Sequence, residues 1–481
     1  GRASEPRRSG SGRSANLASG SEYSVPGLQL GMPDATRRDF LKSAAAGAPA
    51  LLAQRNPNDR INLAVIGFHG RGRAHINGFA KVPNVRIAAL CDVDERLFPD
   101  AVKLVEKLGG NRPATEVDVR RLLERKDIDA VSIATPDYWH ALMTIWACQA
   151  GKDVYVEKPV SFTFVEGRRM VEAARKYQRI VQAGLNMRCE AETRAGVRLL
   201  HEGKMGKVYR AKIDITKPRA SIGRVKESSI PQGVHWDLYL GPSPFRPFTV
   251  NRFHYGWHFF WDTSTTDVGN TGVHHVDLAR WGMNKQEHPI KIHSTGGYYV
   301  WDSDQETPNF QTGSLEYGDG AIMDFETTNL YAPPAESWNI FYTSEGYVEA
   351  GDKWKVMRGN FAPRSGASEI APSGINERVN NASFPRASYT PGPAPETERE
   401  KTVGHFENFI QSVRSRKIED QYCDILDGHM STALCHLANI SYKLGRKLTF
   451  DPKTETFPGD AEATRLLTRV YREPYTLPDK V

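Results

Sequence analysis

Short apolar runs alternate with stretches of helical periodicity along the first half of the chain. The apolar runs fall at residues 61–66, 85–91, 130–134, 153–156 and 180–183. The stretches with apolar residues at helical spacing fall at residues 73–80, 138–149 and 164–177. Strands that alternate with helices in this order are typical of βαβ units, so the pattern predicts a parallel sheet covered by helices.

The second half of the chain has a different pattern. Short strand-like segments separated by Gly, Asp and Asn turns fall at residues 207–216, 289–298, 313–317, 321–328 and 338–343. Helical periodicity is found at residues 272–281, 403–413 and 428–444. We expect an open, mostly antiparallel sheet that is covered by another subunit or by the C-terminal helices. Residues 359–395 are rich in Pro, Ser, Asn and Gly and are expected to form a long excursion or to be partly disordered.

Composition narrows the class of protein. With 481 residues, the chain is long enough for two folded domains plus tails, and 39% hydrophobic and 25% charged residues are ordinary for a globular protein. The net charge of +6 is small for this length and forms no basic stripe, so no nucleic-acid partner is expected. The five cysteines are widely spaced and contain no C-x-x-C, which argues against a disulfide framework and a metal site.

The N-terminal segment, residues 1–53, resembles an export signal. Its first part is Gly/Ser/Arg-rich and is expected to be a disordered tail. Arg37 and Arg38 are followed by Phe40 and then by a short apolar stretch at residues 43–53, as in a twin-arginine signal. That stretch is too short to span a bilayer, so no membrane span is expected. The pattern predicts a periplasmic or secreted protein that uses the twin-arginine export machinery; the alternative is a chance Arg pair in an Arg-rich tail.

A glycine-rich turn directly follows the first strand-like run. The expected cofactor-binding residues of this turn are Gly67, His69, Gly70, Arg71 and Gly72. Glycines there let backbone amides approach a pyrophosphate at a helix N-terminus, and Asp92 at the end of the next strand would accept a hydrogen bond from a ribose. The middle glycine of the usual G-x-G-x-x-G pattern is His69, so the turn should differ slightly in shape. The alternative is a Rossmann-like sheet that binds nothing at this place.

The nature of the dinucleotide depends on charges around this turn. Asp92 favours NAD because a carboxylate repels a 2′-phosphate. Arg71 and Arg73 would partly offset that repulsion, so NADP stays possible.

Glu157, Lys158 and Pro159 follow another strand-like run. Ligands of open α/β sheets bind beyond the carboxyl ends of the strands, so Lys158 would meet a substrate beside the nicotinamide. Taken alone, the tripeptide would favour a surface lysine at a strand end.

From about residue 60 to residue 448 the chain resembles the glucose-fructose oxidoreductase / inositol dehydrogenase (Gfo/Idh/MocA) family. The matching pieces are the turn at 67–72, Asp92, Thr135-Pro136 with His140, Glu157-Lys158-Pro159 and residues 272–277. Residues 236–242, 251–255 and 428–432 extend the resemblance to the secreted, twin-arginine-signal branch. The resemblance implies an α/β Rossmann domain followed by an α+β substrate domain, commonly assembled through its open sheet into homodimers or homotetramers.

The resulting domain prediction has four parts. Residues 1–53 are the tail and signal, 59–185 the NAD(P)-binding domain, 186–450 the substrate and oligomerisation domain with C-terminal helices, and 451–481 a C-terminal tail.

The resemblance also implies the reacting residues. Lys158 would hydrogen-bond the reacting hydroxyl and His274 would take its proton. Thr135, Pro136, His140 and Glu157 would lie with Lys158 at the cofactor, His140 on its nicotinamide side; a helix-capping role for the His140 neighbourhood is the alternative.

The chain departs from the family at the position four residues before His274. The family usually has Asp there, and this chain has Asn270, which can hold a hydroxyl or an imidazole but cannot take a proton. The nearest carboxylates are Asp267 and Asp277; Asp277 could face the same way as His274 on a helix and is expected to contact substrate. His275 is expected to be structural, and a zinc site of His274, His275 and Asp277 is conceivable but disfavoured, because adjacent residues diverge on a helix.

The segment at residues 252–262 is unusually aromatic. Sugar C–H faces stack on aromatic rings, which suits a carbohydrate pocket with His254 and Trp257 as substrate contacts; a core or subunit interface is the alternative. Arg188 follows the last strand of the first domain and is expected to contact substrate or cofactor.

These observations together predict an exported NAD(P)-dependent oxidoreductase with a tightly bound cofactor. It would move a hydride between the nicotinamide and a hydroxyl-bearing carbon of a sugar, glycoside or cyclitol. One alternative is an NAD-recycling glycosidase or lyase that acts through a transient keto-sugar and needs a second base. Another alternative is a non-catalytic relative that binds sugar or nucleotide.

Overall fold

The computed structural model describes residues 60–332, 339–351, 353–360, 388–392, 394–396 and 401–481. The expected disordered tail and twin-arginine signal lie outside these residues, as does most of the expected excursion at residues 359–395.

The first domain is built on a six-stranded parallel sheet with the strand order β3-β2-β1-β4-β5-β6. Its strands are β1 (Ile61–Ile66), β2 (Val85–Cys91), β3 (Ala114–Glu116), β4 (Ala130–Ile133), β5 (Asp153–Val156) and β6 (Val181–Ala183). The connecting helices are α2 (Arg71–Phe79), α3 (Phe98–Gly109), α4 (Val119–Glu124), α5 (His140–Gln149) and α6 (Phe164–Lys176). The prediction of a Rossmann-type parallel sheet is confirmed, and the order of the strands reverses between β1 and β4, where such folds bind ligands.

The second domain is built on a nine-stranded sheet with the order β14-β13-β12-β11-β7-β10-β9-β8-β15. Its strands are β7 (Val208–Thr216), β8 (Lys291–Gly297), β9 (Phe310–Glu316), β10 (Ile322–Thr328), β11 (Asn339–Thr343), β12 (Gly346–Ala350), β13 (Lys355–Asn360), β14 (Ser388–Pro391) and β15 (Leu448–Thr449). Only β7 and β10 pair in parallel, so the expected mostly antiparallel sheet is confirmed. Strands β13 and β14 include the two ends of the excursion that the sequence predicted at residues 359–395.

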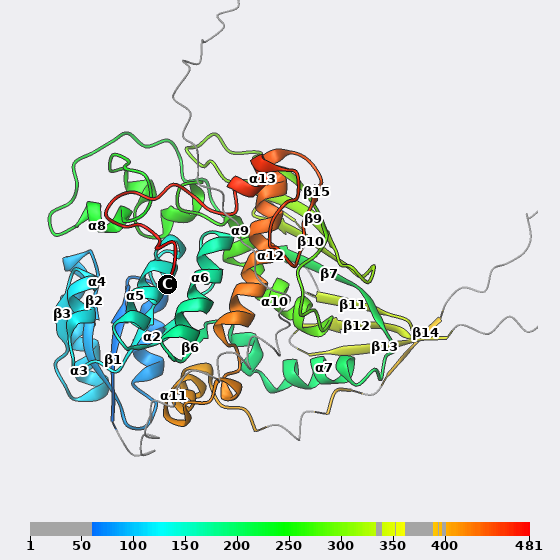
Figure 1. Ribbon diagram of the computed structural model, residues 1–481, viewed down its shortest axis with the longest axis horizontal. Coiled ribbons are helices and arrows are strands. Elements are labelled where there is room, and N and C mark those ends of the chain that lie inside the picture. The colour runs from blue at the N-terminus through cyan, green and yellow to red at the C-terminus, as the bar shows by residue number, and fades with distance from the viewer. Residues whose placement is uncertain (1–59, 333–338, 352, 361–387, 393, 397–400) are drawn as a thin grey trace, which may run out of the picture.

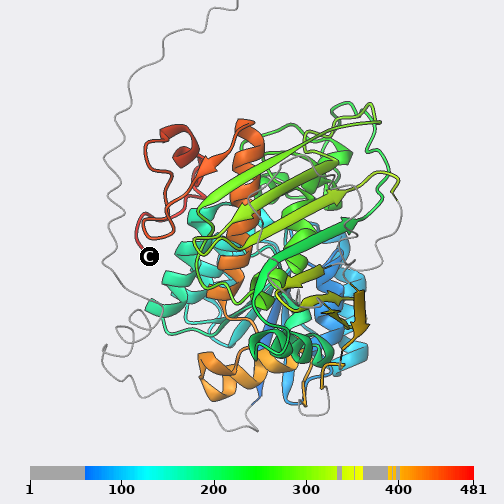
Figure 2. The ribbon, with the colours of Figure 1, turned by 90° about the vertical axis from the view of Figure 1, so that its right-hand side faces the viewer.

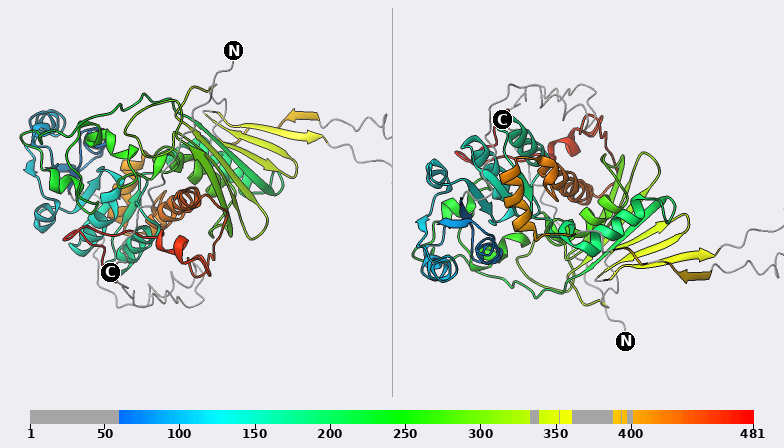
Figure 3. Two further views of the ribbon diagram at one scale, coloured as in Figure 1. Left: turned by 90° about the horizontal axis from the view of Figure 1, so that it is seen from above. Right: turned by 90° about the horizontal axis from the view of Figure 1, so that it is seen from below.

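Helices cover one face of the nine-stranded sheet and leave the other face open in the described chain (Figures 2 and 3). The helices of this part are α7 (Ala191–His201), α8 (Trp236–Leu240), α9 (Thr266–Asn270), α10 (Gly272–Gly282), α11 (His405–Ser415), α12 (Ile425–Leu444) and α13 (Ala461–Arg465). Helix α12 lies between the two domains, where it packs on α6 and β6 of the first domain and on β8 of the second (Figure 1). Its middle is almost completely buried, including polar residues such as His429, Ser431 and Asn439.

The C-terminal part of the chain crosses back to the first domain. Helix α11 packs on α2, and its Phe409 belongs to the same apolar core as Phe79. The segment 451–481, which the sequence set apart as a tail, also packs on the folded body: Tyr475 is buried and Arg469 donates a hydrogen bond to the Tyr138 carbonyl at 2.8 Å. Leu467 and Tyr475 belong to the main apolar core, so this segment is part of the folded body.

Candidate active site

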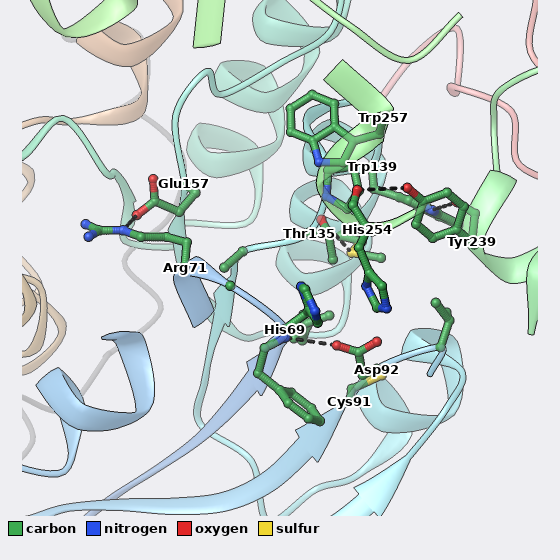
Figure 4. Close-up of a pocket in the computed structure, with 18 of the residues that line it drawn as sticks. His69, Arg71, Cys91, Asp92, Thr135, Trp139, Glu157, Tyr239, His254 and Trp257 are labelled. Carbon is green, nitrogen blue, oxygen red and sulfur yellow. Dashed lines mark hydrogen bonds and ion pairs between the residues drawn. The ribbon is translucent and has the colours of Figure 1, made fainter. Parts of the chain in front are cut away.

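A cavity of about 290 Å³ lies beyond the carboxyl ends of β1, β2 and β4 (Figure 4). One part of its wall comes from the first domain, including the glycine-rich turn, Asp92 and Lys158. The facing part comes from the second domain, including Lys217, the segment 253–257 and Asn270. The cavity therefore occupies the crevice at the switch point of the parallel sheet and is closed by the second domain.

The glycine-rich turn is shaped by close backbone approach. Gly67 has a φ of +77°, and a Cβ on this residue would lie 2.9 Å from the Ala134 carbonyl oxygen. A Cβ on Gly72 would lie 1.8 Å from the Gly67 carbonyl oxygen. A Cβ on Gly70, in contrast, would meet no atom within 4 Å. The turn is tightly packed against the backbone at Gly67 and Gly72 and is open at Gly70, which precedes α2. Anion binding by backbone amides requires such an opening at a helix N-terminus.

Asp92 directly follows β2, and its side chain holds the glycine-rich turn in place. Its carboxylate accepts hydrogen bonds from the backbone N–H of Phe68 at 2.9 Å and of Asp94 at 3.1 Å. Burial raises the pKa of Asp92 to about 6, although these backbone bonds act in the opposite direction. A carboxylate has further lone pairs for a ribose hydroxyl, so Asp92 fits the predicted contact and is ionised near neutral pH.

His69, which replaces the middle glycine, stacks on His254. The two ring centroids are 3.8 Å apart and the planes differ by 15°. His254 Nε2 also lies 3.0 Å from the Asp94 carboxylate, and burial lowers the pKa of His254 to about 4. The ring is therefore neutral and lies over the turn, where it lines the cavity (Figure 4). Its role as a substrate contact stays a prediction.

Arg71 is turned away from Asp92. Its Nε donates to Glu157 Oε1 at 2.7 Å, and His75 Nε2 lies 3.0 Å from the same oxygen. Figure 4 shows Arg71 and Asp92 on opposite sides of the turn. Burial opposes ionisation of Glu157, but His75 and Arg71 hold its pKa well below the usual range. Glu157 thus fixes the position of Arg71 and of the Lys158 backbone rather than offering a free carboxylate to a ligand.

Thr135 and Pro136 line the cavity after β4, but His140 does not. The His140 ring is buried, with Nδ1 2.7 Å from the Pro159 carbonyl oxygen and Nε2 2.9 Å from the Thr135 carbonyl oxygen. His140 therefore ties the two cavity-lining loops together, which corrects its predicted position at the nicotinamide.

Lys158 reaches across the domain boundary. Its Nζ donates to the backbone carbonyl of Asn270 at 2.7 Å and lies 3.4 Å from Asn270 Oδ1. Burial lowers the pKa of Lys158, while the neighbouring Glu157 acts against this shift. The peptide bond that follows, Lys158–Pro159, is cis. The structure thus brings together Lys158 and Asn270, two of the three residues expected to be catalytic.

His274, the third residue, lies in the first turn of α10 and is not among the residues that line the cavity. Its Nδ1 is buried without a hydrogen-bond partner among the described residues. Burial and the nearby Lys158 charge lower its pKa well below the ordinary value, so the imidazole is neutral.

Arg188 and Asp277 pair with each other instead of facing a ligand. Two hydrogen bonds of 2.8 Å join the guanidinium to the carboxylate, and Ser431 donates to Asp277 at 2.6 Å. Both side chains are buried outside the cavity. Their predicted role as substrate contacts is wrong, because a buried charge at either position needs the other as its partner.

The two other polar residues of this region also have protein partners. His275 Nδ1 lies 3.3 Å from Asn339 Oδ1, as expected for a structural residue. Asp267 is held by two hydrogen bonds from Arg219, of 3.0 and 2.8 Å. Asp267 and Asp277, the two carboxylates that the sequence offered near His274, are therefore both paired with arginines.

Tyr255 is a cavity residue that the sequence did not single out. Its hydroxyl accepts a hydrogen bond of 2.9 Å from Arg219 Nη1. Burial alone would raise the pKa of Tyr255, but Arg219 and Lys217 lower it below the ordinary value of 10.0. The available signals were its place in the aromatic segment and the two cationic residues, Lys217 and Arg219, that lie just beyond β7.

Aromatic residues form the remaining wall. Trp257, the predicted substrate contact, lines the cavity beside Trp139 and Tyr239 (Figure 4). Tyr475 from the C-terminal segment completes this wall and packs edge-on against Trp139, with ring centroids 5.3 Å apart. Because it lies so far along the chain from the glycine-rich turn, no local pattern predicted this contact.

Two family models match the chain. One describes an oxidoreductase family with an NAD-binding Rossmann fold and covers residues 61–185. The other describes the C-terminal α/β domain of the same family and covers residues 219–329 and 393–477, so that together they span more than half of the chain. The chain belongs to the Gfo/Idh/MocA oxidoreductase family. The first domain of this oxidoreductase is accordingly an NAD-binding Rossmann domain.

Curated relatives of this oxidoreductase include proteins named as glycosyl hydrolases. A glycosyl hydrolase family 109 protein from Shewanella pealeana is 30% identical over 171 residues, which cover 30% of this chain and 38% of the relative. A second one, from Shewanella sp. strain ANA-3, is 29% identical over 201 residues, which cover 36% of this chain and 44% of the relative. The chain thus matches less than half the length of these relatives.

Solved structures share the fold over most of the chain. The WlbA dehydrogenase from Chromobacterium violaceum, crystallised with NADH and UDP-GlcNAcA, has a TM-score of 0.57 at 19% identity and covers 82% of this chain and 97% of its own. The aldose-aldose oxidoreductase from Caulobacter crescentus has a TM-score of 0.58 at 15% identity and covers 81% of this chain and 100% of its own. At these identities the likeness establishes the two-domain fold.

Proposed function

We propose that this oxidoreductase moves a hydride between NAD and a hydroxyl-bearing carbon of a sugar, glycoside or cyclitol. The observation that carries the proposal is the position of Lys158, which spans from the cofactor domain to Asn270 inside a cavity with aromatic walls. Such a cavity suits a ligand with apolar C–H faces and several hydroxyls. When bound, NAD supplies the nicotinamide that accepts or returns the hydride.

Lys158 has the charge for the step at the hydroxyl. An ammonium stabilises the negative charge that develops on oxygen when the proton and hydride leave. Asn270 holds the amine at its present position, so the charge is placed before substrate arrives. Lys158→Ala should therefore strongly reduce turnover and leave NAD bound.

Two residues can accept the hydroxyl proton. His274 is neutral and has an unpartnered Nδ1, but it lies behind the cavity wall. Tyr255 lines the cavity, and the cations beside it favour its phenolate form. Comparing His274→Ala with Tyr255→Phe in single-turnover hydride transfer identifies which of the two takes the proton.

The turn favours NAD over NADP. Asp92 lines the cavity just after β2, where its carboxylate would repel a ribose 2′-phosphate, and Arg71 is held away from it by Glu157. The cavity is closed on one side by the C-terminal segment through Tyr475, which supports tight retention of the cofactor. NAD that stays with the protein through gel filtration tests this part of the proposal.

The second candidate function is an NAD-recycling glycosidase or lyase. This reaction needs a second base to remove the proton next to the transient carbonyl, and the cavity holds Tyr255 in addition to Lys158. The names of the Shewanella relatives favour the same candidate. A third possibility, binding without turnover, is disfavoured by the buried, positioned Lys158.

One experiment separates these functions. The protein with its retained cofactor is incubated with NAD and a panel of chromogenic glycosides and free sugars, and NADH absorbance and aglycone release are followed together. NADH in proportion to substrate without aglycone establishes the oxidoreductase. Aglycone without net NADH establishes the recycling glycosidase, and binding of both ligands without either signal leaves only the non-catalytic function.

We further propose export through the twin-arginine machinery and assembly into a homodimer or homotetramer. Arg37 and Arg38 carry the first part, and the open face of the nine-stranded sheet carries the second (Figure 3). None of the described helices is long and apolar enough to cross a bilayer. Changing both arginines to lysine should stop export, which tests the first part. Measuring the mass of the protein in solution tests the second part.

A further inference from the structure

Two histidines and a glutamate converge at a place separate from the cofactor cavity. His288 precedes β8, His429 lies in the second turn of α12, and Glu455 lies between β15 and α13. The potential ligand atoms of these three side chains all lie within 4.8 Å of one another. His288 Nε2 and Glu455 Oε1 are 3.3 Å apart.

The two imidazoles are buried without hydrogen-bond partners among the described residues. His429 is 0% exposed and His288 is 2% exposed. Both ring nitrogens of His429 and Nδ1 of His288 have no hydrogen-bond partner among the described residues, and His288 Nε2 has only the Glu455 oxygen 3.3 Å away. Buried polar atoms in native proteins are rarely left without a partner, so these nitrogens in one place point to a group that binds them.

The surroundings decide what kind of group fits. Phe164 packs on both rings, with centroids 5.2 Å from His288 and 5.2 Å from His429, and Phe450 packs on His288. These apolar walls limit the access of water to the imidazoles. A neutral imidazole offers a nitrogen lone pair to a metal ion.

The local packing is consistent with a built cluster. A Cβ on Gly167 of α6 would lie 2.4 Å from His429 Nδ1, so only glycine lets the ring lie there. Arg168, the next residue, donates through Nε to Glu455 Oε2 at 2.9 Å. A ligating carboxylate is commonly oriented by such an outer hydrogen bond.

We propose that His288, His429 and Glu455 bind a divalent transition-metal ion of the zinc class. Two imidazole nitrogens and one carboxylate oxygen are the donors that such ions prefer, at bond lengths of about 2.0–2.2 Å. Small side-chain movements bring atoms that lie within 4.8 Å into that range. The ion ties the segment before β8 to α12 and to the 451–456 turn, and its role is structural.

The charges of Arg168 and Glu455 indicate what the fourth ligand of the ion is. Because Arg168 already neutralises Glu455, the ion keeps a net positive charge, which a fourth ligand from solvent offsets. The side chains of Arg168 and Glu455 are 24% and 20% exposed, so the cluster is open to a water, hydroxide or chloride on that side. The site is independent of the proposed hydride transfer. It also revises the expectation of no metal, because its ligands come from three distant segments with no spacing motif.

The test uses the full chain after chelator treatment and dialysis. Co²⁺ and Zn²⁺ are titrated by calorimetry, Co²⁺ is followed by its visible d–d bands, and Tm is measured with and without metal. We expect one ion per chain, Co²⁺ bands of a nitrogen- and oxygen-ligated site, and a higher Tm with metal. A wild-type chain that takes up no ion, and whose Tm the chelator leaves unchanged, overturns the proposal.

Variants assign the site. His429→Gln and Glu455→Gln should lose the Co²⁺ bands and the rise in Tm, while NAD binding shows that they are folded. His293→Gln removes an exposed histidine of β8 in the same region and should bind as the wild type does. Equal Co²⁺ bands in His429→Gln and wild type place the ion elsewhere and refute the assignment. If neither variant folds, the metal dependence of the wild-type Tm and spectrum still decides the question.

Discussion

The two ends of the cavity are built in different ways. The dinucleotide end comes from one continuous stretch, β1 through Asp92, and works mainly through backbone atoms. The reacting end is assembled from side chains of separate segments, namely Lys158, Lys217, Tyr255 and Asn270. Binding through backbone atoms depends on the shape of the turn and tolerates most side-chain changes. Chemistry at the reacting end depends on individual charged side chains. Changes at the two ends should therefore separate binding of NAD from turnover.

The largest effect is expected at the reacting end. Lys158→Ala removes the only cation that contacts Asn270 in the described cavity and should lower kcat by about 100- to 1,000-fold, because it stabilises charge in the transition state. The Kd for NAD should change little, as measured by fluorescence titration. Arg73→Ala, beside the turn but outside the cavity lining, is the matched control. Full turnover in Lys158→Ala would show that the reacting end is somewhere else.

At the dinucleotide end, the strongest change is in the turn itself. Gly72→Ala places a Cβ 1.8 Å from the Gly67 carbonyl oxygen, so the turn must open. We expect at least about a tenfold loss of NAD affinity, by the tenfold-per-1.4-kcal/mol relation. Gly70→Ala, which meets nothing within 4 Å in the protein, tests the ligand side of the same turn. If Gly72→Ala binds NAD normally, close packing is not what shapes the site.

The pH dependence of the reaction rate tests the role of Tyr255 at the reacting end. Because Arg219 and Lys217 lower its pKa below 10.0, the phenolate that acts as a base should appear at a lower pH than for a free tyrosine. A rate limited by this base rises with pH until that pKa and then levels. Tyr255→Phe should lose about 100-fold in rate together with this limb of the profile. A profile unchanged in Tyr255→Phe assigns the proton to His274.

Asp92 gives the dinucleotide end a pH dependence of its own. Burial raises its pKa to about 6, so the carboxylate is ionised above pH 6 and becomes protonated as the pH falls through 6. The affinity for NAD should fall below pH 6, by up to about tenfold per pH unit if only the ionised form binds. Calorimetry at several pH values checks this, and Asp92→Asn should bind weakly at every pH without that dependence.

The smallest effect is expected where the C-terminal segment closes the cavity. Tyr475→Ala removes one aromatic wall and should speed NAD dissociation by about tenfold or less, since it loses packing without a charge. Tyr331→Ala, at an exposed tyrosine away from the cavity, is the control. Stopped-flow release of NADH distinguishes the two.

The same contrast explains what the sequence could reveal. The parallel sheet, the turn and Asp92 were predictable because they are local and their periodicity is set by burial on both faces. The Lys158 position followed from the end of a strand. Arg188 and Asp277 were misassigned because these two buried charges pair only in the folded protein, and their spacing in the sequence does not indicate the pair. Tyr475 was missed for a related reason, since its partner Trp139 lies in a different domain.

The return of the C-terminal segment to Trp139 has a consequence for how the protein matures. The ribosome delivers the glycine-rich turn and Trp139 long before Tyr475, so a growing chain can form the dinucleotide turn while the cavity still lacks a wall. A chain interrupted before residue 475 would keep the turn but hold its nucleotide loosely. Capture of the cofactor is thereby linked to the end of synthesis, and a cell that selects loaded molecules would also discard truncated ones.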